Sequence, residues 1–274
     1  MNIEKVKNYN QKMLAVLATI LVALGLLGLI SMSYFFINEV FSYRINDRES
    51  GIIANQETDV LQEQNLRKQL ISFENKVLVD SVNLVYFIPV KQKNLLEAEH
   101  ISDGTLGLLN MSGSSSYSKS RRDYYYGSFN NLLIYDYKNN QTIKLFNKRI
   151  GLGDIKYYKF AAETLITFKG ADVDSDKNGK INLYDLSSLY VYPVNEKKLR
   201  KIGKNNWTFI EYDIVPGTKN MMVHFGIDRN EDGYYDPDLE PQIIVLYNFE
   251  KDEILDIVNQ EMKQELQKLV EGSI

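Results

Sequence analysis

Apolar residues are most concentrated near the N-terminus, where a run of 25 residues from Met13 to Ile37 contains no Asp, Glu, Lys, Arg or His. About 20 such residues are enough for a helix to cross the hydrocarbon core of a bilayer. The main alternative is a cleavable secretory signal, whose apolar core is usually shorter. The pattern therefore predicts a retained transmembrane helix over residues 13–37.

Beyond residue 76 the pattern changes to short segments of the kind that form half-buried β-strands. Residues 77–79 and 84–88 predict two strands, and the second of them should end at Pro89. The preceding segment, residues 55–71, has leucines among many charged and amide side chains and predicts a short amphipathic helix.

Three later segments share one order of elements, which is a strand containing tyrosine, a polar turn and a second apolar strand. Each of them predicts a β-hairpin. They are residues 132–137 with 143–146, 189–192 with 199–202, and 245–249 with 254–257. The second and third copies extend backwards by two more strands each, at 155–158 with 165–168 and at 210–213 with 221–225.

The repeating unit then has four strands in about 50 to 55 residues, which resembles the blades of β-propeller proteins. A closed propeller typically has about 4 to 8 blades, whereas two full units and one partial unit occur here. The resemblance implies a mainly β domain of antiparallel repeats. Three arrangements stay open: a partial propeller-like stack, a two-sheet sandwich, or a ring completed by other chains.

The C-terminal segment 259–274 has apolar residues at helical spacing, namely Met262, Leu266, Leu269 and Val270, followed by Gly272 as a natural stop. It predicts a short amphipathic helix. We expect this helix to cap a sheet face, and docking on another subunit is the alternative.

Two acidic stretches lie between predicted strands, and their glycines, Gly179 and Gly233, are 54 positions apart. Oxygen side chains at alternate positions, closed by a glycine, suit a hard cation. The first stretch resembles the calcium loop of EF-hand proteins, with Asp in place of the usual Glu at the last ligand. The resemblance implies that these residues bind Ca²⁺, the fourth through its carbonyl: Asp174, Asp176, Asn178, Lys180 and Asp185.

The second stretch matches the same loop in part. Its candidate ligands are Asp228, Asn230, Asp232, the carbonyl of Tyr234, Asp236 and Glu240. The twelfth position is Leu239, so the closing ligand is displaced or absent. The resemblance stops at the loops, because EF-hand loops lie between helices and these lie between predicted strands. Ordinary exposed turns are the alternative interpretation of both stretches. We predict Ca²⁺ in a structural role.

The composition of the chain argues against several classes of function. A net charge of −4 argues against a general nucleic-acid binder. The chain has no cysteine, which excludes disulfides, thiolate zinc sites and cysteine nucleophiles. His100 and His224 lack metal-ligand spacing, and no nucleophile elbow, phosphate loop or HExxH motif occurs. We therefore predict no catalytic residues and no enzymatic activity.

Three lysines precede the apolar run within residues 1–12, and two arginines follow it at 44 and 48. The positive-inside tendency predicts a cytoplasmic N-terminus and an extracytoplasmic C-terminal part, periplasmic in a bacterium. The expected organisation is a tail (1–12), a transmembrane helix (13–37), a juxtamembrane segment (38–75), a β-repeat domain (76–258) and a helix (259–274).

These features predict a single-pass accessory or scaffolding subunit of a membrane or cell-envelope complex. Its expected partners are other membrane or envelope proteins, contacted through the transmembrane helix and the β domain. Small residues such as Ala18 and Gly25 lie on one side of that helix and would permit close approach of another helix. Two alternatives stay open: a membrane-tethered hydrolase with an acidic cleft, and a ligand sensor that acts through a partner helix.

Overall fold

The fold is that of a computed structural model, which describes residues 3–49, 51–53, 55–100, 120–121, 124–125 and 127–272. The chain divides into two compact units, Met1–Glu49 and Ser50–Ile274. The first unit is helix α1, Ile3–Glu49. Its stretch Tyr9–Tyr34 contains 18 consecutive residues with a mean hydropathy of 2.8 and is long and apolar enough to cross a membrane. Residues 38–49 of the expected juxtamembrane segment continue this helix.

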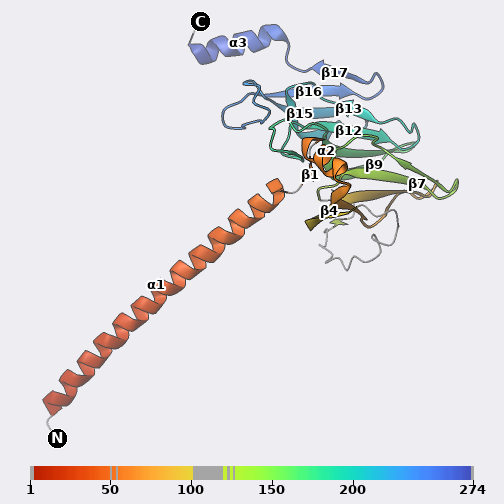
Figure 1. Ribbon diagram of the computed structural model, residues 1–274. Helices are drawn as coiled ribbons and strands as arrows, with labels where there is room; N and C mark the ends of the chain where they lie inside the picture. The colour runs from red at the N-terminus through yellow and green to blue at the C-terminus, as the bar shows by residue number, and fades with distance from the viewer. Residues whose placement is uncertain are drawn as a thin grey trace. The chain divides into compact units, whose positions relative to one another are not determined.

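The second unit is mainly antiparallel β-sheet (Figure 1). The first sheet contains β2 (Leu66–Phe73), β3 (Val77–Asp80), β4 (Val85–His100), β7 (Asn131–Asp136) and β8 (Gln141–Lys144). The middle sheet contains β5 (Ser120–Arg121), β6 (Tyr124–Tyr125), β9 (Gly151–Lys159), β10 (Thr164–Ala171), β12 (Ser188–Pro193) and β13 (Arg200–Ile202). The last sheet contains β14 (Trp207–Ile214), β15 (Met221–Ile227), β16 (Gln242–Asn248) and β17 (Glu253–Asp256).

The three predicted hairpins are confirmed as β7–β8, β12–β13 and β16–β17. The two backward extensions are also confirmed, because β9 pairs with β10 and β14 pairs with β15. Strand order in the last sheet is β14-β15-β16-β17, and the middle sheet has β9, β10, β12 and β13 in the same succession. The two full repeats are therefore two four-stranded meanders, each within one sheet.

The middle sheet is covered on both faces, because its successive side chains point into two different cores. Ile166 and Phe168 of β10 belong to a core shared with the first sheet. Leu165 of β10 and Val191 of β12 belong to a second core, shared with the last sheet. The alternation of side chains along a strand accounts for this division. Three sheets are thus layered with two cores between them.

The first sheet departs from two expectations. The predicted helix over 55–71 is helical only as α2, Asn55–Glu63, and β2 begins at Leu66. The β unit therefore starts before the expected boundary at residue 76. Pro89 does not end its strand, because β4 continues to His100. Along one edge of β4 the neighbour changes from β3 to β2 at this proline, and the Pro89 carbonyl accepts a hydrogen bond from the Glu74 amide at 2.9 Å. A residue without an N–H is tolerated at such a junction.

The C-terminal helix is confirmed as α3, Gln260–Glu271. The Asn259 side chain accepts a hydrogen bond from the Met262 amide, and Gly272 ends the helix in the left-handed conformation. The prediction that this helix caps a sheet face is wrong, because α3 has no buried residue. Its apolar side chains at 262, 266, 269 and 270 are exposed.

Candidate metal centre

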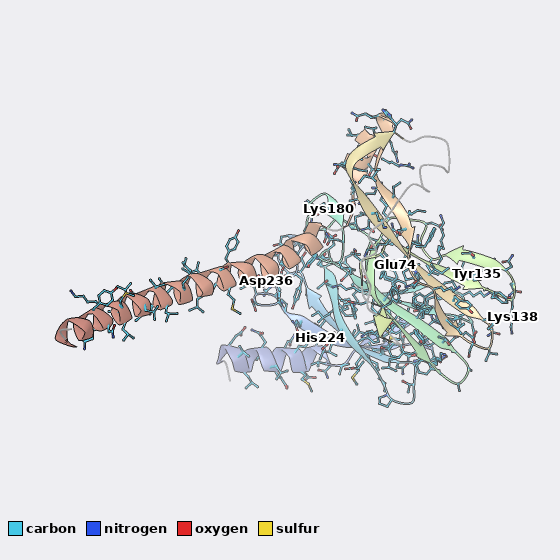
Figure 2. All side chains as sticks on the ribbon, turned by 90° about the horizontal axis from the view of Figure 1, so that it is seen from below. Glu74, Tyr135, Lys138, Lys180, His224 and Asp236 are labelled. Carbon is cyan, nitrogen blue, oxygen red and sulfur yellow. The ribbon has the colours of Figure 1, made fainter. Side chains whose placement is uncertain are left out.

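The two acidic stretches occupy equivalent places in neighbouring sheets. Loop 1, residues 172–187, connects β10 to β12, and loop 2, residues 228–241, connects β15 to β16. In each case the loop joins the second and third strands of a four-stranded meander. Lys180 of loop 1 and Asp236 of loop 2 are labelled in Figure 2. The repeat inferred from sequence thus places both loops at the same step of the fold.

Loop 1 gathers three carboxylates. One oxygen from each of Asp174, Asp176 and Asp185 lies within 4.8 Å of the others. Three carboxylates at this spacing repel one another unless a cation lies among them. They are three of the side-chain ligands expected from the sequence.

The closing residue of loop 1 is Asp185, which is only 1% exposed. Its Oδ1 accepts hydrogen bonds from the Ser175 amide at 2.7 Å and the Asp176 amide at 3.4 Å, and its Oδ2 accepts from the Asn182 amide at 2.9 Å. Burial raises the pKa of Asp185, and the nearby charge of Asp176 raises it further, although the amide hydrogen bonds act in the opposite direction. A bound cation would supply the positive charge that favours the ionised form.

The turn of loop 1 is built by its own side chains. Asp174 accepts hydrogen bonds from the Asn178 amide at Oδ1 and from the Gly179 amide at Oδ2, both at 3.0 Å. The Asn178 side chain accepts from the Lys180 amide at 2.9 Å. Gly179 has φ +84°, a conformation that glycine adopts without steric cost. Asn178 and Lys180 therefore lie in the same turn as the three carboxylates.

Loop 2 repeats this pattern position by position. Asp228 accepts from the Gly233 amide at 2.9 Å, and Gly233 has φ +85°. The Asp232 side chain accepts from the Tyr234 amide at 2.9 Å, as Asn178 does from Lys180. The Asn230 side chain accepts from the Asp232 amide, also at 2.9 Å. The two loops thus have the same local fold.

The closing acid of loop 2 is Glu240, displaced by one position from the loop 1 spacing. Its Oε1 accepts from the amides of Arg229 at 2.7 Å and Asn230 at 3.3 Å, and its Oε2 accepts from the Asp236 amide at 3.0 Å. These amides occupy the same loop positions as those that bind Asp185. The longer glutamate compensates for the extra residue. Hydrogen bonds from these amides, the Asp236 amide above all, lower the pKa of Glu240.

Loop 2 is less complete than loop 1 as a metal site. Among the described residues, the three-carboxylate cluster is found in loop 1 alone. The Asp236 side chain accepts from the Asp238 amide at 2.9 Å. Asp228, however, is only 2% exposed, and within the described part of the chain its Oδ1 has no hydrogen-bond partner. A buried carboxylate oxygen without a partner is costly, and a cation ligand is one way to satisfy it.

The two loops touch each other through Ser175, which the sequence did not single out. The Ser175 hydroxyl donates to the Gly233 carbonyl at 2.6 Å. Its oxygen accepts from the Leu186 amide at 2.8 Å and also lies 3.2 Å from Asp185 Oδ1. A serine in a polar loop carries no signal of such a contact, because the contact depends on how neighbouring sheets pack.

Loop 1 also pairs with the short segment that follows α1 in the sequence. Residues Lys180–Ile181 form β11, which pairs antiparallel with β1, Ile52–Ile53. The Ile53 carbonyl accepts from Arg149 at 2.8 Å, and the Gly51 carbonyl accepts from Gln69 at 2.8 Å. The segment directly after the apolar helix is therefore built into the β unit at the edge of loop 1.

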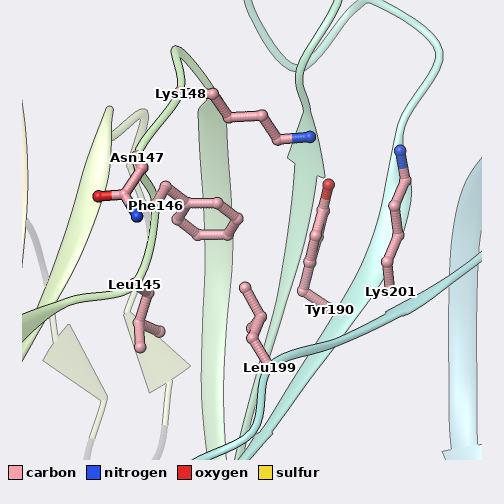
Figure 3. Close-up of a pocket in the computed structure, with 7 residues that line it drawn as sticks. All are labelled: Leu145, Phe146, Asn147, Lys148, Tyr190, Leu199 and Lys201. Atoms are coloured by element: carbon pink, nitrogen blue, oxygen red, sulfur yellow. The ribbon is translucent and has the colours of Figure 1, made fainter.

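Among the pockets elsewhere in the described part of the β unit, two have charged residues in their linings. One of about 390 Å³ is lined by Leu145, Phe146, Asn147, Lys148, Tyr190, Leu199 and Lys201 (Figure 3). Both of its lysines pair with Asp172. The other, of about 260 Å³, is lined in part by Asp80 and Glu163.

The two pockets differ in their acidic groups. Among the described residues, the lining of the first contains no carboxylate. In the second, burial raises the pKa of Asp80, but hydrogen bonds from Asn83 and Val82 outweigh it and the net shift is downward. A general acid would need an upward shift. His224, in β15, faces Glu211, with 3.7 Å between Nδ1 and Oε1.

Comparison with known proteins adds no function to this geometry. No protein-family model matches the chain, and no curated protein matches it.

Proposed function

We propose that the chain is a membrane-anchored accessory or scaffolding subunit of a membrane or cell-envelope assembly. In this proposal α1 is the anchor, and the β unit is extracytoplasmic and stabilised by Ca²⁺ in loop 1 and loop 2. The partner is another membrane or envelope protein that covers an apolar surface of the β unit.

The observation that carries the proposal is the outer face of the last sheet, defined here by Met222, Ile244, Leu246 and Leu255. Met222, Leu246 and Leu255 are directly paired neighbours on three adjacent strands. Met222 is 48% exposed, Ile244 52% and Leu255 39%. The inner face of the same strands lies in a core. Contiguous exposed apolar residues on a folded sheet mark interaction surfaces.

Two further features support a partner-dependent role. The exposed apolar side of α3 follows the last sheet in the chain and is also uncovered. The apolar stretch Tyr9–Tyr34 is longer than the apolar core of a secretory signal, which has about 7 to 15 residues, and this favours a retained anchor over a removed signal. Residues Met1–Glu49 form a separate compact unit that contains the apolar stretch.

The test is the size of the assembly that contains the full chain, extracted from its native membrane in mild detergent. We expect the unmodified chain to elute as part of a larger complex whose other components are identified by cross-linking and mass spectrometry. Replacing Met222 and Ile244 by Glu should release it, because charges on an apolar interface are costly to bury.

A matched control is Val82→Glu, which adds the same charge at an exposed apolar residue in the turn between β3 and β4. This variant should stay in the complex. Circular dichroism of both variants checks that the β unit is intact. Elution of the unmodified chain as a monomer, or retention of the double variant, would contradict the proposal.

A further inference from the structure

We propose that loop 1 and loop 2 form one two-cation unit in which each bound Ca²⁺ strengthens the binding of the other, through the contact between Ser175 and Gly233. This inference rests on the cation binding proposed above and adds a coupling between the sites. The unit would join the middle sheet to the last sheet, since one loop belongs to each.

A buried carboxylate oxygen in loop 2 also indicates a ligand, in addition to the clustered acids of loop 1. Asp228 Oδ2 accepts from the Gly233 amide across the turn, so the carboxylate lies within loop 2. Its Oδ1 is buried and has no hydrogen-bond partner among the described residues, although the residue is only 2% exposed. In loop 1, by comparison, both oxygens of Asp174 accept backbone hydrogen bonds. The second loop therefore has an unsatisfied buried acceptor where a cation ligand is expected.

The coupling follows from the single proton of the Ser175 hydroxyl. That hydroxyl lies 2.6 Å from the Gly233 carbonyl and 3.2 Å from Asp185 Oδ1, and it can donate to only one of them at a time. A cation bound by Asp185 would occupy this carboxylate and leave the proton to Gly233. The Ser175–Gly233 bond would then be formed without competition.

Gly233 transmits the effect to loop 2 because its backbone N–H and its carbonyl are both hydrogen-bonded. Its carbonyl accepts from Ser175, and its amide donates to Asp228. Fixing this glycine holds the Asp228 carboxylate in the orientation that leaves Oδ1 available. Contact between the loops is also close, since a Cβ at Gly233 would lie 1.8 Å from the Ser175 carbonyl oxygen. The backbones of the two loops are therefore in contact at Ser175 and Gly233.

Calorimetric titration of CaCl₂ into the full chain in detergent tests the proposal. We expect two ions per chain. In the variant Asp174→Asn/Asp176→Asn, loop 2 should bind Ca²⁺ about tenfold more weakly, within the range typical of coupled sites. Asp228→Asn should weaken loop 1 by the same factor, because linkage between binding sites is reciprocal.

Ser175→Ala separates coupling from ligation, because it keeps every proposed ligand and the Ser175 amide. It should bind two ions with the dependence between sites lost, and Ser175→Thr should restore it. Ser81→Ala, in the turn between β3 and β4, is the matched control and should behave as the unmodified chain. Circular dichroism confirms that each variant is folded.

The number of bound ions and their affinities test Ca²⁺ binding and the coupling between the sites separately. If the unmodified chain binds no Ca²⁺, the cation part of the proposed function fails and the coupling fails with it. If it binds one ion only, the two-cation unit is overturned. If it binds two ions whose affinities are unchanged by removing the other site, the coupling alone is overturned.

Discussion

At the scale of single residues, the two loops are defined by equivalent positions whose side chains bond to the same amides. Asp185 and Glu240 each accept from the second, third and ninth residues, counted from Asp174 in loop 1 and from Asp228 in loop 2. The carboxylates of loop 1 were predicted from sequence spacing. The role of Glu240 was not fixed by spacing, because one extra residue shifts the register and only the folded loop shows that a longer side chain compensates.

Gly179 and Gly233 form a matched pair for the contact between the loops. Both have φ near +85°, but a Cβ at Gly179 would meet nothing within 4 Å, whereas at Gly233 it would meet the Ser175 backbone. Gly179→Ala should lower the free energy of unfolding by about 1 kcal/mol, the cost of a left-handed alanine. Gly233→Ala should cost clearly more. Urea unfolding of the full chain in detergent, followed by Trp207 fluorescence, measures both; equal losses would contradict the contact.

At the scale of elements, the hairpins were predictable because tyrosine-bearing apolar strands alternate with polar turns. Strand β2 was not, since Leu66–Phe73 mixes charged and apolar residues and is fixed by pairing with β4. The prediction that Pro89 ends its strand was wrong for a similar reason. Whether a proline ends a strand depends on the neighbouring strand, and at Pro89 the neighbour of β4 changes from β3 to β2. The exposure of α3 could not be predicted from the sequence either. An apolar stripe predicts that one face of a helix is buried, but it does not say which surface buries it.

The exposed state of α3 gives a prediction for its N-cap. Asn259→Ala removes the hydrogen bond to the Met262 amide, which is 2.8 Å long, and should destabilise the helix locally by about 1 kcal/mol. Because α3 buries no residue, the melting temperature of the β unit should not change. Hydrogen exchange should speed up in residues 262–264 only. A lower melting temperature for the whole unit would show that α3 packs on it.

At the scale of the whole molecule, the chain consists of an apolar helix followed by a β unit whose last sheet has an uncovered face. The orientation of the chain across a membrane stays a prediction, and the cysteine-free sequence makes it simple to test. Lys5→Cys and Lys251→Cys each introduce the single thiol of the chain. A membrane-impermeant maleimide should label Cys at 251 on intact cells and Cys at 5 only after permeabilisation. The opposite pattern would reverse the topology.

In the proposed structure, Ca²⁺ stabilises the two loops and thereby the sheets that they belong to. Thermal unfolding of the unmodified full chain in detergent, first with excess CaCl₂ and then with EDTA, measures this stabilisation. At about one hundred times the dissociation constant, one ion contributes about 2.7 kcal/mol, which corresponds to a rise of about 5 to 10 °C for a unit of this size. Equal melting temperatures with and without Ca²⁺ would contradict the claim.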